Sequence, residues 1–379
     1  MSDVVIVGGG IVGSACAYEL AKAGASVTLL EYGKTGMQST NAAAGMLAPM
    51  VDAAAPGPML DAGTRALREF PALVSEIESQ CGFDVELRLD GILKVALAPD
   101  QLEDLRTRHA WQRDKGLPLE WLDAAMCHEL ETKLNAGVLG GVFSPGEGGV
   151  SNQLLALGLE RAAMAHGVLI RQRTPVTGFT SRGGSVVAVR SGDASFACDA
   201  VVLAAGARTG QIASLLRRPG PVGARPASLP LVPVRPVRGQ MIALGGMSTP
   251  IRHVVWGPDG YLVPRANGLV FAGTTVEEVG FRRRTTKAGL RSIRSMALDL
   301  VPQLAAAKAL FDWAGLRPGT PDGLPIIGPL PEWPNVVAAT GHYRNGILLG
   351  PLTGKLVAHG ITTGDWSDVP AEFDPARFS

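Results

Sequence analysis

The sequence contains few cysteines, and none of them lies close to another. Only four occur, Cys16, Cys81, Cys127 and Cys198, and no C-x-x-C is present. Cysteines scattered in this way are typical of free thiols in a reducing compartment, not of a disulfide framework. The opening Met-Ser-Asp leads straight into an apolar strand, which leaves no space for a cleaved signal peptide. We therefore expect a cytoplasmic location.

The sequence also lacks an excess of either charge and any long apolar run. Lys and Arg number 35 against 34 Asp and Glu. A nucleic-acid-binding protein uses a basic surface, so this balance argues against a nucleic-acid partner. No apolar run reaches the roughly 20 residues that span a bilayer, so no membrane partner is expected. Metal-ligand spacing, a G-x-S-x-G elbow and a paired-carboxylate motif are also missing.

The opening of the chain carries a strand, a glycine-rich turn, a helix and a second strand that ends at an acid. These are residues 4–7, the G-x-G-x-x-G of Gly8, Gly10 and Gly13, residues 11–23, residues 27–30 and Glu31. The order is that of a β-α-β unit with a dinucleotide fingerprint. The glycines allow a tight turn and a close approach to a pyrophosphate, and the helix N-terminus offers free N–H groups. Glu31 can accept hydrogen bonds from the ribose of an adenosine, so we predict an adenine dinucleotide site.

A polar loop at 32–41 leads into small residues at 42–47. The residues alone allow two interpretations of this segment. Small side chains would let the backbone lie against a flat ligand. Alternatively, Ser39, Thr40 or Asn41 caps an ordinary helix start.

The rest of the chain alternates between helical and strand patterns. Apolar spacing predicts helices at 59–81, 101–115, 152–166, 288–298 and 347–361. Residues 85–98 have the pattern of a hairpin that turns at Asp90-Gly91. Further strands are predicted at 168–171, 186–189, 199–207, 239–244, 252–256, 261–264, 269–273 and 336–339. The proline-dense segment 217–236 is interpreted as a domain crossing or exposed loop. With 379 residues, two domains are the default.

Four motifs give the chain a family resemblance. They are V-V-I-V-G-G-G-I-V-G at its start, A-A-A-G-M-L at 42–47, W-A-G-L-R-P-G-T-P-D-G-L-P-I-I-G at 313–328 and G-H-Y-R-N-G-I-L-L at 341–349. The sequence resembles the glycine oxidases, in the D-amino-acid oxidase and sarcosine oxidase family of flavoproteins, over nearly its whole length. The resemblance implies noncovalent FAD, a mixed sheet over the substrate and oxidation of an amine next to a carboxylate.

The fold class expected on this basis is α/β. A Rossmann-type, glutathione-reductase-like FAD-binding domain should comprise residues 1–84, 147–218 and 314–379. An inserted substrate-binding domain with a mixed or antiparallel sheet should comprise residues 85–146 and 219–313.

Three residues match the substrate-binding positions of the family. Arg317 matches its carboxylate-binding arginine, Arg344 its second arginine and Tyr261 its pocket tyrosine. An arginine fork suits a carboxylate in a dry pocket. The alternatives are a structural ion pair for Arg317, a contact with flavin or a carbonyl for Arg344, and sheet packing for Tyr261.

The resemblance also assigns residues to the cofactor. The ADP portion should contact Gly8, Gly10, Ile11, Val12, Gly13 and Glu31, with Val176 at the adenine and Ala205 and Gly206 near the ribose. The region from pyrophosphate to isoalloxazine should contact Ser39, Thr40, Ala44, Gly45, Met46, His342, Arg344, Asn345, Gly346, Ile347 and Leu348. His342 is not assigned as a base, because a lone histidine is more often structural.

The chain departs from the family pattern at three places. Asp259 stands where a histidine is frequent, Val276 replaces a methionine near the substrate, and the loop at 50–59 is rich in Ala, Pro and Gly where an acidic loop is usual. A smaller Val276 and an apolar mouth predict room for an N-substituted glycine or a larger amino acid.

The predicted reaction is therefore FAD-dependent oxidation of glycine, sarcosine or a bulkier N-substituted glycine. Hydride passes from Cα to flavin, the imine hydrolyses to glyoxylate and an amine or ammonia, and oxygen becomes hydrogen peroxide. One alternative is a D-amino-acid dehydrogenase with another electron acceptor, and a second is a non-catalytic dinucleotide-binding subunit. The oligomeric state stays open, with a homo-oligomer among the alternatives.

Overall fold

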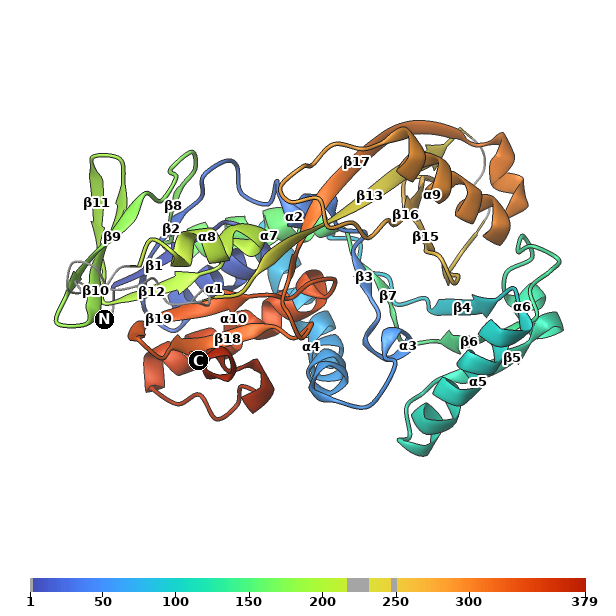
Figure 1. Ribbon diagram of the computed structural model, residues 1–379, viewed down its shortest axis with the longest axis horizontal. Helices are drawn as coiled ribbons and strands as arrows, with labels where there is room; N and C mark the ends of the chain where they lie inside the picture. The colour runs from blue at the N-terminus through green and yellow to red at the C-terminus, as the bar shows by residue number, and fades with distance from the viewer. Residues whose placement is uncertain (1–2, 217–231, 247–250) are drawn as a thin grey trace.

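Two large sheets organise the structure, a computed structural model that describes residues 3–216, 232–246 and 251–379. A six-stranded sheet occupies the half of the molecule that holds the N-terminus, and an eight-stranded sheet occupies the other half (Figure 1). The long strands β13 (Arg235–Gly245) and β17 (Lys308–Gly319) reach from the second half toward the first.

The six-stranded sheet has the order β18-β19-β12-β1-β2-β8. Its strands are β1 (Asp3–Val7), β2 (Ser26–Leu30), β8 (Leu169–Arg171), β12 (Ala200–Leu203), β18 (Ile326–Leu330) and β19 (Trp333–Thr340). Neighbouring strands are parallel except for the β18–β19 pair. The predicted β-α-β unit is confirmed, with helix α1 (Ile11–Lys22) between β1 and β2. The sheet assembles segments from the beginning, middle and end of the chain.

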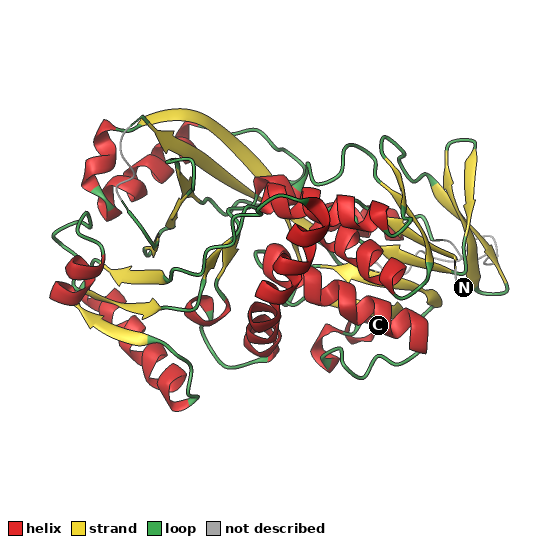
Figure 2. Ribbon diagram, turned by 180° about the vertical axis from the view of Figure 1, so that it is seen from behind, coloured by secondary structure: helices red, strands yellow, loops and turns green. Residues whose placement is uncertain are grey.

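Four helices cover this sheet and each other. They are α1, α4 (Pro58–Cys81), α7 (Asn152–Ala165) and α10 (Gly346–Thr363), and Figure 2 shows a group of helices in that half of the molecule. Small residues bring α1 and α10 close together, since a Cβ on Gly354 would lie 2.7 Å from the Ala15 carbonyl oxygen. The apolar residues of these helices, among them Leu20 and Phe70, form the larger core.

The eight-stranded sheet has the order β17-β13-β16-β15-β14-β4-β6-β5. The strands not yet given are β4 (Ile92–Ala96), β5 (Glu120–Asp123), β6 (Gly140–Ser144), β14 (Val254–Trp256), β15 (Tyr261–Pro264) and β16 (Val270–Gly273). Only the β4–β14 pair is parallel, so the predicted mixed sheet is confirmed. Helix α9 (Lys287–Leu300) buries Ile293 and Leu300 in a second core with strand residues such as Leu262. Helices α5 (Pro99–Asp114) and α6 (Ala124–Leu130) pack beside β4, β5 and β6.

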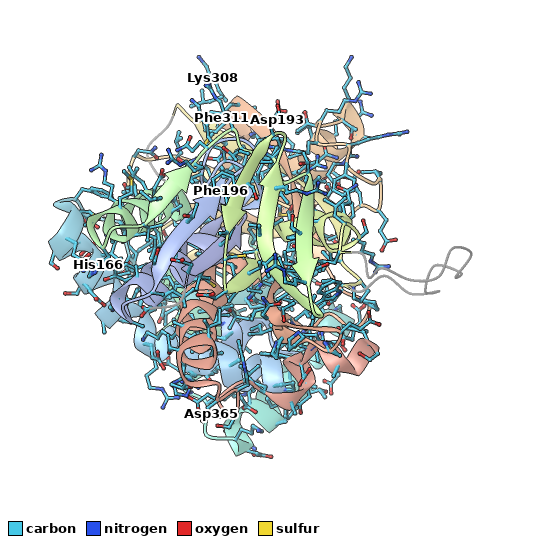
Figure 3. All side chains as sticks on the ribbon, turned by 90° about the vertical axis from the view of Figure 1, so that its left-hand side faces the viewer. His166, Asp193, Phe196, Lys308, Phe311 and Asp365 are labelled. Carbon is cyan, nitrogen blue, oxygen red and sulfur yellow. The ribbon has the colours of Figure 1, made fainter. Side chains whose placement is uncertain are left out.

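Smaller elements complete the structure. A three-stranded sheet of β9 (Gly178–Arg182), β10 (Ser185–Ser191) and β11 (Ala194–Ala197) faces the viewer in Figure 3, where Phe196 is labelled on it. Strands β3 (Met46–Leu47) and β7 (Gly148–Gly149) form a two-stranded sheet. The short helices are α2 (Ser39–Ala42), α3 (Pro49–Asp52) and α8 (Thr209–Ala213).

The hairpin predicted at 85–98 is wrong, because only its second half forms a strand, β4. Before β4, the backbone at Glu86 takes a positive φ of 58°, which breaks the extended conformation. Arg88 instead forms an isolated bridge with Gly149, so this segment pairs with β7 and not with β4. Residues 217–231 of the proline-dense segment lie outside the described residues, and from Arg235 the segment is already strand β13.

The predicted domain boundaries stay a prediction, and we propose that the division follows the two large sheets. Strand β17 would then belong to the substrate-binding side. No helix among the described residues is long and apolar enough to cross a membrane.

Candidate active site

A cavity of about 540 Å³ joins the two sheets. It begins at the glycine-rich turn after β1 and ends at the face of the eight-stranded sheet, where Met241, Tyr261 and Arg317 line it. Its volume lies within the range of small-molecule and cofactor sites.

The glycine-rich turn fits a phosphate-bearing ligand, because its glycines leave the backbone uncovered by side chains. The surrounding atoms leave no space for a side chain there. At Gly8 the φ of 110° favours glycine, and a Cβ would lie 2.5 Å from the Ala204 carbonyl oxygen. A Cβ on Gly13 would overlap the Gly8 carbonyl oxygen, so glycine there allows α1 to pack on β1. Ile11 donates its N–H to Thr40 Oγ1 at 2.9 Å. The turn therefore presents backbone and the N-terminus of α1 to the cavity, as a pyrophosphate site requires.

Glu31 lies buried at the end of β2 and lines the same cavity. Its two carboxylate oxygens accept the N–H groups of Gly9 and Gly33, each at 2.8 Å. These bonds fix the carboxylate, which keeps lone pairs for the hydroxyls of a ribose. This fixed acceptor therefore fits the ribose in the adenosine part of FAD.

The structure gathers most of the residues predicted to bind FAD around this cavity. Those that line it are Gly8, Gly10, Ile11, Val12, Glu31, Ser39, Thr40, Ala44, Gly45, Met46, Val176, Ala205, Gly206, His342, Arg344, Asn345, Gly346 and Ile347. Gly13 and Leu348 are not in the lining: Gly13 packs helix on strand, and Leu348 is buried near Gly63.

The far end of the cavity is built on one transverse row of the eight-stranded sheet. In register across five strands lie Lys94, Trp256, Tyr261, Gly273 and Met241. Residues paired in this way point to the same face of a sheet. The Tyr261 hydroxyl lies 3.7 Å from Met241 Sδ, and its ring centroid lies 5.7 Å from that of Trp256. Burial raises the pKa of Tyr261, so its hydroxyl remains a donor at neutral pH.

Arg317 approaches this row from the edge strand β17. Its Nη1 donates to the Thr275 carbonyl at 3.2 Å and its Nη2 donates to Thr274 Oγ1 at 2.8 Å. Burial lowers the pKa of Arg317, yet a guanidinium remains charged in proteins. Glycine at 239 leaves room for the guanidinium in this position, because a Cβ there would displace it. The charge is thus held in a partly buried place, and none of its partners among the described residues is a carboxylate.

A second set of polar contacts fixes the segment that holds Arg317. Glu277 accepts hydrogen bonds from Nε and Nη2 of Arg238, both at 2.9 Å, and from Thr275 Oγ1 at 2.8 Å. The Arg238 guanidinium holds the pKa of Glu277 down at about 2. Glu277 therefore remains ionised and keeps Thr275 in place beside Arg317.

Arg344 and His342 follow β19 and have different surroundings. The Arg344 guanidinium lines the cavity and lies 5.7 Å from the centroid of the Trp256 ring. His342 is buried, and its Nε2 lies 2.8 Å from Thr353 Oγ1 in α10. Burial lowers the pKa of His342 to about 4, so it is neutral at physiological pH. The contact between His342 and Thr353 connects the loop after β19 to α10.

The structure contradicts the prediction that a smaller Val276 and an apolar mouth enlarge the substrate pocket. Val276 is 58% exposed, and neither Val276 nor Asp259 lines the cavity. Its neighbour Glu277 bonds to Arg238, whereas the Val276 side chain lies in solvent. The mouth predicted to be apolar also carries an acid, since Asp52 lines the cavity.

Sequence reasoning missed several residues of this end, among them Gly239, Met241, Trp256, Thr274 and Asp52. Trp256 had one available signal, an aromatic residue that ends a strand immediately before the turn Gly-Pro-Asp-Gly. The described residues contain no group of three or more His, Cys, Asp or Glu that could hold a metal ion.

Comparisons with known proteins point in one direction. The DAO family, described as FAD dependent oxidoreductase, matches residues 3–359. The chain is 35% identical over 379 residues to the glycine oxidase of Geobacillus kaustophilus, which covers 100% of this chain and 96% of that protein. The crystal structure of glycine oxidase from the same organism superimposes with a TM-score of 0.91 at 31% identity, covering 100% and 99% of the two chains. Iminodiacetate oxidase from Chelativorans sp. BNC1 superimposes with a TM-score of 0.85 at 27% identity, covering 99% and 98%.

Proposed function

The chain belongs to the DAO family of FAD dependent oxidoreductases, and from that premise we propose that it oxidises a glycine-type amine, with Arg317 holding the substrate carboxylate. The observation that carries this assignment is a partly buried guanidinium that lines the cavity and whose neighbours, within the described part of the chain, are hydroxyls and a carbonyl but no carboxylate. Such a charge needs an anion, and the arginine fork matches a carboxylate.

The residues around Arg317 orient the substrate. The Tyr261 hydroxyl donates a hydrogen bond to the bound carboxylate, and Arg344, which lies near Trp256, supplies a second positive charge. With the carboxylate fixed, the main freedom left to the substrate's Cα–H bonds is rotation about the bond between Cα and the carboxylate, which restricts their orientation in the cavity. When bound, FAD supplies a two-electron acceptor for the hydride of that bond.

The chain needs no strong general base for this reaction. His342 is neutral and engaged with Thr353, so it does not take the proton. A substrate amine that binds in its neutral form uses its own lone pair to assist loss of hydride. The resulting imine is hydrolysed by water to glyoxylate and an amine or ammonia, and oxygen serves as the final acceptor, giving hydrogen peroxide.

The substrate class includes glycine, sarcosine and N-substituted glycines. Two of the similar proteins act, by their names, on glycine and on iminodiacetate, which is itself an N-substituted glycine. We also propose a cytoplasmic location, which the free cysteines support. A dehydrogenase with another electron acceptor is the competing function.

The test is to add glycine, sarcosine, N-ethylglycine and D-alanine to the yellow protein without oxygen and to follow bleaching of the flavin. Bleaching by a glycine-type amine, with peroxide formed when air is admitted, supports the proposal. Bleaching without reoxidation by air would favour the dehydrogenase. A flavin that none of the four compounds bleaches would contradict the proposal.

A further inference from the structure

Asp52 is an acid in a cavity that is otherwise suited to anions. Among the described residues that line the cavity, only Glu31 and Asp52 are acidic. Glu31 is engaged by two backbone N–H groups at the adenosine end. Asp52 is half-buried at the end of α3, and no hydrogen bond or ion pair of its side chain is found within the described part of the chain.

The backbone that carries Asp52 is fixed by three polar side chains from the eight-stranded sheet and its surroundings. Glu147 accepts the N–H groups of Met50 and Val51, the latter at 3.1 Å. Lys94 donates to the Val51 carbonyl at 3.2 Å, and Gln112 donates to the Met50 carbonyl at 2.9 Å. Glu147 and Gln112 are themselves buried. Helix α3 therefore holds Asp52 at a defined place in the cavity wall.

That place is the substrate end. Lys94, which bonds to the residue before Asp52, lies with its Nζ 5.1 Å from the Trp256 ring centroid. The Arg344 guanidinium lies 5.7 Å from the same ring, and Tyr261 packs against its edge. Two cations therefore flank the tryptophan at the wall where Asp52 ends α3, and Asp52 offsets their charge.

We infer that Asp52 determines substrate selection at this site, favouring amines with one carboxylate over amines with two. The inference rests on the proposed function, in which Arg317 takes the α-carboxylate and the amine with its substituent faces the remaining wall. A positively charged or N–H-bearing amine gains from a nearby carboxylate. Lys94 and Arg344 would attract a second carboxylate on the substituent, but Asp52 repels it in the same partly desolvated pocket, where charges interact strongly, and so opposes that attraction.

The test uses two pairs of compounds that differ by one carboxylate. Sarcosine and iminodiacetate are the substrates, and methoxyacetate and diglycolate are their oxygen analogues, which lack the amine and cannot be oxidised in the same way. The holoenzyme and its Asp52→Asn and Asp52→Ser variants are titrated with the analogues, with binding followed by the change in the flavin spectrum. The kcat/KM values of the two substrates are measured in parallel.

We expect the wild-type protein to bind methoxyacetate more tightly than diglycolate and both variants to shift that ratio at least tenfold toward diglycolate. The ratio of kcat/KM should shift in the same direction for sarcosine and iminodiacetate. Asp259→Asn is the matched control, because Asp259 lies on an exposed turn outside the cavity, and it should leave both ratios unchanged.

Two results would overturn the inference. Ratios that stay within twofold of wild type in both Asp52 variants contradict it, and if sarcosine is still oxidised, the proposed function stands. A wild-type protein that binds neither analogue and oxidises neither substrate contradicts the inference and the proposed function together.

Discussion

Removing the Arg317 side chain tests the proposed carboxylate site most directly. In Arg317→Ala, a substrate carboxylate would enter a partly buried place with the Tyr261 hydroxyl but without its principal charge partner. Truncating one partner of a buried, hydrogen-bonded charge pair costs about 2–5 kcal/mol. At about 1.36 kcal/mol per factor of ten, kcat/KM should fall roughly 30- to 5,000-fold.

Arg317→Lys separates charge from geometry. Lysine keeps the charge but cannot bond to Thr274, Thr275 and a carboxylate at once with a planar fork, so we expect a loss on the order of tenfold to a hundredfold. The assay is the rate of anaerobic flavin reduction against substrate concentration, and the flavin spectrum reports that FAD is retained. Alanine at the exposed Arg282 is the control. A kcat/KM for Arg317→Ala within threefold of wild type would refute the carboxylate assignment.

Three further perturbations probe other parts of the molecule. Gly239→Ala places a methyl group on the Arg317 guanidinium and should lower kcat/KM about a hundredfold with FAD retained, as measured by flavin reduction. Gly13→Ala forces α1 away from β1 and should weaken FAD binding at least tenfold, as measured by titration of the apoprotein; unchanged affinity would contradict the packing argument. Burial raises the pKa of Glu147 to about 7, so the folded state keeps a proton that the unfolded chain loses above about 4.5. The free energy of unfolding should therefore fall by about 3 kcal/mol between pH 4.5 and 7. Urea titrations should show that Glu147→Gln lacks this dependence of the free energy of unfolding on pH.

The first part of the fold could be predicted because its signals are local. Strand, glycine motif, helix and acid follow one another within the first 31 residues, and the structure realises each of them. The resemblance extended this to the family, the cofactor and the class of enzyme, all of which the comparisons confirm. The hairpin at 85–98 failed because alternation of apolar and polar residues predicts an extended segment but not its partner. Here Arg88 pairs with Gly149.

The substrate end could be predicted only in part, because its geometry depends on strand register. Arg317, Tyr261 and Arg344 do line one cavity, but their roles stay predictions. No spacing along the chain indicates that Lys94 lies in the same row as Met241, since four strand pairings set that alignment. The exposure of Val276 likewise depends on contacts of its neighbour Glu277, which sequence patterns do not encode.

The close packing of α1 against α10 has a consequence for synthesis of the chain. The glycine-rich turn that faces the pyrophosphate leaves the ribosome early, but the helix that supports it is made near the end. At 5–20 residues per second, the interval between the two helices is on the order of tens of seconds. During that interval the apolar face of α1 lacks its partner, and the cavity lacks Arg344 and the start of α10. We therefore expect FAD to bind only after α10 and the strands of the eight-stranded sheet have been synthesised.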